Sequence, residues 1–298
     1  MHKYLRSIGF SGYRKEKDID ALLSGFEERY VSIGKNMLNA VGDIQTEIRA
    51  QVAKNIGVCI VGTFDEDGAY RRQCYYPYLS AEDVSTTVPV SVHHRVDEEI
   101  YSGLADDSRI GVTLIFRLDN VAEYFEQKKA GADTNSCITK LSAFCDEGKV
   151  LLPVSRTVKQ AVGIRKDYQQ RDELIEAAKG GDENALESLT MGDMKAYMEV
   201  SRRLSNEDIY SIVDSCFMPQ GVECDVYQVV GEIVKVEKMR NLMTDEEIFD
   251  LTIECNDMIM HIGINRVDLA GEPEPGRRFK GRIWMQGRIE LAGMPGAV

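Results

Sequence analysis

The sequence predicts an α+β protein: an N-terminal antiparallel sheet with helices, a helical middle segment and a small C-terminal β-barrel. Three observations lead to this prediction. Apolar residues recur at helical spacing near the N-terminus and in the middle of the chain, and they alternate with period two elsewhere. Short turns such as Asp65-Glu66-Asp67-Gly68 join successive strands, which is typical of antiparallel pairing. The clearest alternation, from Phe279 to Leu291, predicts a strand with one buried face.

The first predicted domain covers residues 1–155 and mixes helices with strands. Lys15 to Tyr30 and Ala40 to Asn55 carry apolar residues at helical spacing, so both are predicted to be helices. A short helix over 121–130 is predicted to end at Gly131. Asp146-Glu147-Gly148 is interpreted as a hairpin turn. Strands are predicted over 56–64, 69–79, 86–96, 109–118, 136–145 and 149–155.

The second predicted domain, 156–221, is helical, and the third, 222–298, is β. Lys179-Gly180-Gly181-Asp182 combines a glycine helix end with an aspartate that caps the next helix. Strands are predicted over 226–238, 247–255, 258–264 and 279–291. So few strands favour a small closed or half-closed barrel of the oligonucleotide-binding (OB-like) or SH3-like size, with a short β-sandwich as the alternative. Gly281 and Gly287 on its inner face permit the coiling that closure needs.

Composition narrows the functional classes. The chain has 298 residues and a formal net charge of −13, which disfavours nonspecific nucleic-acid binding. It has no apolar run near the roughly 20 residues that span a bilayer, and its first ten residues lack a signal-peptide core, so a cytoplasmic protein without membrane attachment is expected. Seven cysteines, an odd number with no C-x-x-C pair, predict buried reduced thiols rather than disulfides or zinc sites.

No stretch carries a recognisable catalytic motif. The signatures of nucleotide-binding loops, zinc proteases and serine hydrolases are all missing from the sequence. No catalytic, cofactor-binding or metal-ligating residue is therefore assigned, and no cofactor is predicted. One alternative is a thiol dyad in which His93 or His94 activates Cys59 or Cys74, although no local signature supports it. His261 is predicted to point outward.

The polar face of the 279–291 strand holds the one positive signal for binding. It contains the only tryptophan of the chain among basic and amide side chains: Lys280, Arg282, Trp284, Gln286 and Arg288. An aromatic ring among cations is the chemistry of a platform for single-stranded nucleic acid. The alternative is that Trp284 packs against the helical segment or the N-terminal sheet. This alternative is favoured because large aromatic rings tend to anchor interfaces.

These observations lead to three functional hypotheses. The first is a non-enzymatic intracellular binding or scaffold protein that docks a protein partner or a second subunit. The second is single-stranded nucleic-acid binding through the outer face of the C-terminal barrel. The third is an unrecognised thiol-dependent enzyme.

Several segments together resemble a family of uncharacterised proteins. They lie at Met1–Arg6, Ile8–Phe10, Gly62–Gly68, Gly180–Glu183, Glu187–Thr190, Ser201–Arg203, Asp208–Val213, Phe217–Pro219, Gly221–Asp225 and Gly231–Ile233. The family is a domain of unknown function from anaerobic, gut-type Firmicutes, and the resemblance runs along almost the whole chain. It implies a bacterial cytoplasmic protein and assigns no activity, so no functional residue follows from it.

Overall fold

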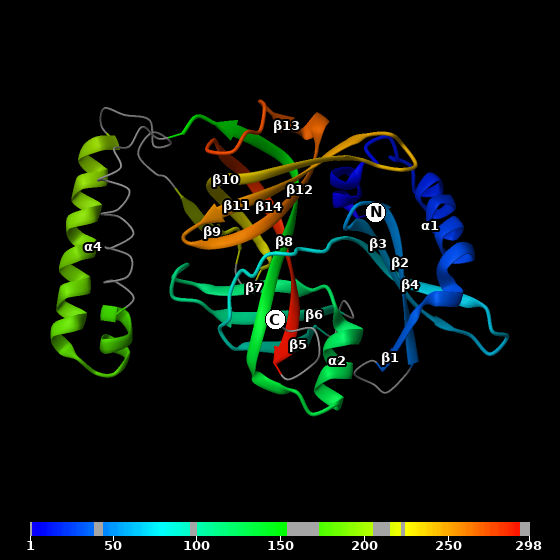
Figure 1. Cartoon of the computed structure of the whole chain (residues 1–298), viewed down its shortest axis with the longest axis horizontal. Coiled ribbons are helices and arrows are strands. Elements are labelled where there is room, and N and C mark those ends of the chain that lie inside the picture. The colour runs from blue at the N-terminus through cyan, green and yellow to red at the C-terminus, as the bar shows by residue number, and fades with distance from the viewer. Residues whose placement is uncertain are drawn as a thin grey trace.

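The computed structural model describes residues 2–38, 44–95, 100–153, 173–204, 215–221 and 224–292. They form a mixed α+β structure that is mostly sheet with few helices (Figure 1). The strands form a four-stranded and a ten-stranded sheet. The predicted α+β class is therefore confirmed.

The four-stranded sheet is antiparallel in the order β1-β2-β3-β4. Its strands are β1 (Lys35–Leu38), β2 (Ile44–Ala53), β3 (Ile56–Phe64) and β4 (Tyr70–Leu79). The helix predicted over 40–55 is wrong, because this segment contains β2. Ile44, Ile48 and Val52 are four residues apart, a spacing that also places them on one face of a strand. Hydrogen bonding to β3 decides between the two structures.

An N-terminal α-helix lies against this sheet. The 3₁₀ helix η1 (Lys3–Ile8) leads into α1 (Glu16–Tyr30), which confirms the first predicted helix; η2 (Val31–Ile33) follows. The apolar stripe of α1 is buried: Ile19, Leu22, Leu23 and Phe26. Figure 1 shows α1 along the outside of β2, β3 and β4.

The ten-stranded sheet has the order β13-β8-β12-β11-β10-β14-β7-β6-β5, and β9 pairs with β10 beside it. Its strands are β5 (Val90–Arg95), β6 (Ile100–Asp106), β7 (Thr113–Leu118), β8 (Asp133–Leu151), β9 (Cys216–Pro219), β10 (Val226–Arg240), β11 (Glu247–Cys255), β12 (Met258–Asn265), β13 (Leu269–Ala270) and β14 (Arg278–Ala292). The helix α2 (Val121–Lys129) confirms the prediction over 121–130, and η3 (Arg266–Asp268) precedes β13.

The hairpin predicted over 136–155 is wrong, because the single strand β8 continues through the expected turn. Asp146-Glu147-Gly148 lies inside this single strand, where Gly148 pairs with Gly281 of β14 and with Leu269 of β13. A Cβ at Gly148 would lie 2.7 Å from the Phe279 ring, so the glycine makes room for an aromatic side chain rather than a turn. β8 also pairs in parallel with β12 and β13, as β14 does with β7, so the sheet is not purely antiparallel as predicted.

The C-terminal strands agree closely with their predicted ranges. β10, β11, β12 and β14 each begin within one residue of the prediction. Asn256 and Asp257 both have positive φ, 52° and 58°, and form the expected turn between β11 and β12. β14 pairs with β10 on one side and with β8 on the other, so strands from the first and third predicted domains share one sheet. The predicted domain boundaries stay a prediction.

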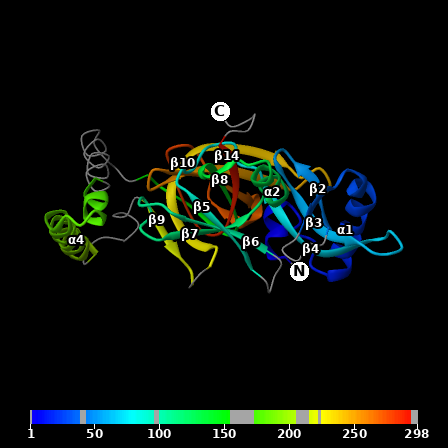
Figure 2. The same ribbon diagram turned by 90° about the horizontal axis from the view of Figure 1, so that it is seen from below.

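The middle segment contains α4 (Glu183–Leu204), which lies to one side of both sheets (Figure 2). The helix end predicted at Gly180-Gly181 and the helix start predicted at Asp182 are both confirmed. Gly181 has φ of 91°, and the Asp182 carboxylate accepts hydrogen bonds from the N–H groups of Asn184 and Ala185. Residues 154–172 and 205–214, predicted as the rest of the helical block, lie outside the described residues. Within the described ranges, no helix combines the length and apolarity needed to cross a membrane.

Candidate functional site

The two faces of β14 have different surroundings. Its inner face is buried as predicted: Phe279, Ile283, Met285, Ile289 and Leu291 all belong to the core of the larger sheet. The five predicted binding residues lie on the outer face, and the structure separates them. Two of them line an open pocket, two are buried, and one joins a network of ion pairs.

Lys280 and Arg282 line the open pocket, which has a volume of about 700 Å³. The register of the strands places Lys280 directly opposite Lys149 of β8, and Arg282 opposite Gln228 of β10. Lys3 of η1 adds a fourth basic side chain to the lining. Like charges directly opposite each other in a sheet repel, so this part of the sheet favours an anionic group nearby.

Acidic side chains also line the pocket, but two of them already have basic partners. Asp146 accepts a hydrogen bond of 2.9 Å from Lys3. Asp268, with a side chain only 6% exposed, forms a bidentate pair with Arg6 at 2.6 and 2.5 Å. These two carboxylates are paired within the chain, and the remaining basic side chains of the lining are Lys149, Lys280 and Arg282. We name these three residues the basic strip.

Trp284 lies between the two sheets and is only 7% exposed. Its ring stacks on Tyr4 with centroids 5.3 Å apart and lies 4.7 Å from His2. Its indole N–H donates to Asp225 at 2.8 Å. The indole therefore contacts η1 and the core of the N-terminal sheet, and the packing alternative is the one observed. The nucleic-acid hypothesis thereby loses the aromatic ring on which bases would stack.

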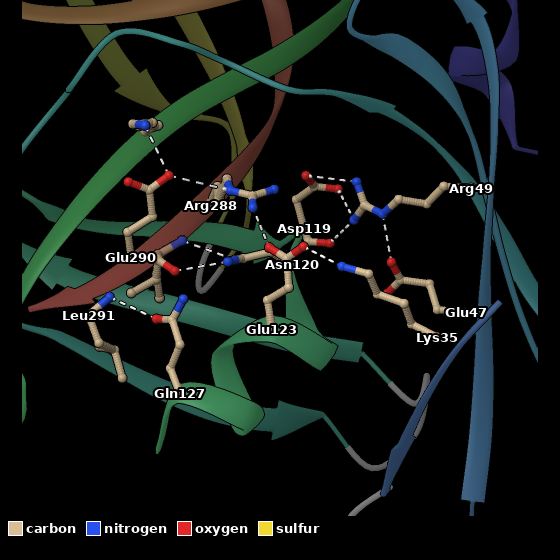
Figure 3. Close-up of polar contacts among 12 residues, drawn as sticks. Lys35, Glu47, Arg49, Asp119, Asn120, Glu123, Gln127, Arg288, Glu290 and Leu291 are labelled. Atoms are coloured by element: carbon tan, nitrogen blue, oxygen red, sulfur yellow. Dashed lines mark hydrogen bonds and ion pairs between the residues drawn. The ribbon is translucent and has the colours of Figure 1, made fainter. Parts of the chain in front are cut away.

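Gln286 and Arg288 continue the outer face towards α2. Gln286 is fully buried, and its amide donates to the Pro77 carbonyl at 2.8 Å. Arg288 forms ion pairs with Glu123 and, at 3.5 Å, with Glu290 (Figure 3). Both side chains therefore have partners within the chain. Ligand binding by these two residues stays a prediction.

The network around Arg288 extends to the N-terminal sheet through alternating charges. Glu123 also pairs with Lys35 of β1 at 2.6 Å, and Glu290 pairs with Lys140 at 2.9 Å. In the same region Arg49 of β2 bonds both Glu47 and Asp119, the latter just beyond β7 (Figure 3). These contacts join β1 and β2 to α2 and β14, and they explain how the two sheets keep their relative position.

Glu47 and Asp119 are buried carboxylates that pair with Arg49, whose side chain is 25% exposed. The exposed fractions of the Glu47 and Asp119 side chains are 4% and 2%. Burial raises the pKa of Glu47, and Arg49 only partly offsets this. Burial opposes the charge of Arg49, but Asp119 and Glu47 outweigh it and raise its pKa well above the usual value. These ion pairs have a structural role, since a buried charge that loses its partner strongly destabilises the fold.

The prediction that His261 points outward is wrong. The residue is 5% exposed and lies between two carboxylates, with Nδ1 3.0 Å from Asp250 and Nε2 2.9 Å from Asp83. Strict alternation along β12 places it opposite the Met260 face, but the loop after β4 covers that side with Asp83. Burial lowers the pKa of His261, whereas the hydrogen bonds and charges of Asp250 and Asp83 outweigh burial and raise it above 6.5.

His261 is expected to make stability pH-dependent. Because its folded pKa lies above the unfolded value of 6.5, its contribution is fully present below pH 6.5 and disappears as pH rises through the folded pKa. Urea unfolding of wild type and His261→Gln measures this: the stability difference between them is largest in weak acid and shrinks towards alkaline pH. Asp83→Asn removes one of the two charges and reduces the effect. A difference that grows with pH would contradict the assignment.

The thiol dyad lacks its geometry. Cys59 is fully buried in β3 of the smaller sheet, whereas His93 and His94 lie on β5 of the larger one. Cys74 lies on β4, which also belongs to the smaller sheet. Burial raises the pKa of Cys59 well above its ordinary value, which opposes formation of the nucleophilic thiolate.

Sequence reasoning missed Lys149 and Lys3 as neighbours of the predicted site. Lys149 was assigned to a strand after a hairpin, so its position beside β14 was not foreseen. Lys3 belongs to the N-terminal segment, and only tertiary folding brings it to the pocket.

Comparison with known proteins identifies the family but no activity. The family DUF3881, described as "Domain of unknown function, E. rectale Gene description", matches residues 5–287. The chain therefore belongs to this family, which confirms the resemblance to an uncharacterised family of gut Firmicutes. No curated protein and no solved structure matches the chain.

Proposed function

We propose that this member of a family without an assigned activity is a non-enzymatic binding protein that docks acidic side chains of a protein partner in the pocket beside β14. The observation that carries the proposal is the basic strip. Lys149 and Lys280 lie opposite each other in paired strands, and Arg282 follows on the same face, in a pocket of about 700 Å³. A volume of this order is common for specific binding sites.

The charge of the pocket supports an acidic partner. The whole chain carries a net charge of −13, yet basic side chains outnumber acidic ones in this lining. Two of the acidic side chains form ion pairs with Lys3 and Arg6. A carboxylate of a partner would meet complementary charge at the basic strip, and complementary charge favours both encounter and register.

The surrounding strands offer a rigid support for such a site. β8, β12, β11, β10 and β14 are paired in sequence, and β14 pairs back to β8. We infer that these five strands form the small barrel expected for the C-terminal part, completed by β8, and that the basic strip lies on its outer wall. A cytoplasmic location stays a prediction.

Charge reversal in the basic strip is expected to abolish acidic-peptide binding. The probe is fluorescein-labelled hexaglutamate at low salt, measured by fluorescence anisotropy. Lys280→Glu with Arg282→Glu should weaken binding by about tenfold or more, because each lost contact near a surface contributes about 1 kcal/mol and repulsion is added. Lys15→Glu with Lys17→Glu, both exposed at the start of α1, is the control with the same charge change.

Three outcomes decide the proposal. Salt-sensitive binding that the first double variant loses and the control retains supports it. Equal weakening in both variants would show a nonspecific charge effect and contradict the assigned pocket. Binding of tripolyphosphate without binding of hexaglutamate would overturn a protein partner in favour of a small anion.

A further inference from the structure

The loop between β3 and β4 is an acidic projection of the molecule. Glu66 and Asp67 lie at its end, and both are exposed. In Figures 1 and 2 this loop reaches past α1, beyond the rest of the molecule on that side. Phe64, where β3 ends, is 50% exposed and adds an apolar side chain two residues before the first acid. We name Phe64, Glu66 and Asp67 the acidic tip.

Hydrogen bonds within the loop fix its conformation. Asp65 accepts hydrogen bonds from the N–H groups of Asp67 and Ala69, at 3.1 and 2.8 Å. Its second carboxylate oxygen accepts a hydrogen bond of 2.8 Å from Arg71. Gly68 has a positive φ of 77°, which the turn requires. The loop is thus ordered before it meets a partner, and an ordered loop loses less conformational entropy on binding.

The pocket beside β14 offers a surface that complements the acidic tip. Its basic strip presents positive charge to the two carboxylates. Val267 lines the same pocket and is 66% exposed, so it offers an apolar contact for Phe64. In Figure 1 the loop between β3 and β4 lies away from β13, whose residues line the pocket. The acidic tip therefore meets the pocket of another chain rather than its own.

Repulsion between two copies opposes this contact, but it acts over longer distances. Each chain carries a net charge of −13. At about 0.1 M salt, exposed charges separated by more than about 10 Å are largely screened. Ion pairs between the acidic tip and the basic strip are much shorter than this, so they retain part of their attraction. Association is therefore expected to be strongest near 0.1 M salt and to weaken at higher concentrations.

We propose that the protein partner of the basic strip is a second copy of this chain, which inserts its acidic tip into the pocket. The inference rests on the proposed docking function and names the partner for it. The contact joins two different surfaces of identical chains and is therefore heterologous. Copies joined in this way either close into a ring or extend into a chain.

Sedimentation equilibrium of the full chain at about 0.1 M salt tests the proposal. The weight-average mass of wild type should rise with protein concentration. Lys280→Glu with Arg282→Glu reverses the charge of the pocket, and Glu66→Lys with Asp67→Lys reverses that of the acidic tip. Each double variant should weaken association by about tenfold or more, because two surface ion pairs are lost and repulsion is added.

Controls separate the contact from a change of net charge. Asp18→Lys with Glu28→Lys, both exposed on α1, changes the net charge as the tip variant does and should retain association. The control for the pocket variant is Lys15→Glu with Lys17→Glu. Phe64→Ala removes the apolar part of the acidic tip and should weaken association less than the charge reversals.

An equimolar mixture of the pocket variant and the tip variant gives the sharpest result. The first retains the acidic tip and the second retains the pocket. The tip of one should therefore enter the pocket of the other, and the mixture should regain association that neither variant has alone. A chain that carries both double changes exchanges the two charges and should also recover association.

Each outcome bears on the proposal. Association that both double variants lose and that both controls and the mixture show supports it. A wild-type mass that stays constant, while hexaglutamate binds to the basic strip, overturns the second copy as partner and leaves the docking function intact. Association that either double variant retains lies elsewhere and also overturns the proposal. If a double variant does not fold, Arg282→Glu and Glu66→Lys provide the same test.

Discussion

Replacing Trp284 with alanine is expected to lower the free energy of unfolding by about 3–5 kcal/mol. The indole is buried, stacks on Tyr4 and lies 6.5 Å from the Phe144 ring, centroid to centroid. Its removal leaves a cavity between the sheets and deprives Asp225 of a hydrogen-bond donor. Since Trp284 is the only tryptophan, unfolding in urea should be followed by circular dichroism rather than by fluorescence.

Phe64→Ala is the matched control for this prediction. Phe64 is an aromatic residue at the end of β3 that is 50% exposed, and its ring contacts that of Tyr70. Its loss should cost less than about 1 kcal/mol, as for most surface substitutions. Trp284→Phe retains an aromatic ring and should be less destabilising than Trp284→Ala. A Trp284→Ala variant as stable as the control would contradict the interior position of the indole.

Replacing Arg49 with methionine is expected to destabilise the protein by about 3–5 kcal/mol, because it leaves buried carboxylates without their cation. Arg49 joins Glu47 at 2.6 Å to Asp119 at 3.0 Å and thereby connects β2 to the segment after β7. Its guanidinium also lies 4.7 Å from the centroid of the Tyr78 ring. Urea unfolding at neutral pH measures the loss.

Two further variants separate charge from packing. Arg71→Met removes an ion pair with Asp65 at the surface, where the Arg71 side chain is 70% exposed. This change should lower the free energy of unfolding by less than about 1 kcal/mol. The double variant Glu47→Gln/Arg49→Met removes one of the stranded charges, so it should be more stable than Arg49→Met alone. If the double variant is less stable by the full sum of the two changes, the buried-charge explanation is wrong.

The elements that sequence reasoning located well are those with a strong local signal. β14 begins one residue before and ends one residue after its predicted range, and β11 matches its range at both ends. In both, apolar side chains alternate over a whole strand, and that pattern has no helical counterpart. The segment over 40–55 lacked such a signal, because apolar residues spaced by four fit a helix and a strand equally.

The surroundings of the candidate site depend on contacts between segments that are far apart in the sequence. Five residues on one face of β14 were foreseen from alternation alone, and all five do lie on its outer side. Their environments differ because η1 covers the centre, α2 lies at one end and the other end is open. Nothing within the strand distinguishes Arg282 in the open pocket from Arg288 in the charge network.

The sequence alone determined the α+β class, the strand from Phe279 to Leu291 and which of its faces enters the core, because these follow from local periodicity and the burial of apolar side chains. Only the tertiary structure decided that β8 pairs along β14, that Trp284 is an internal contact between sheets, and that Lys149 and Lys280 meet. These features join residues more than a hundred positions apart, and strand pairing of that kind is set by the whole fold rather than by the local pattern.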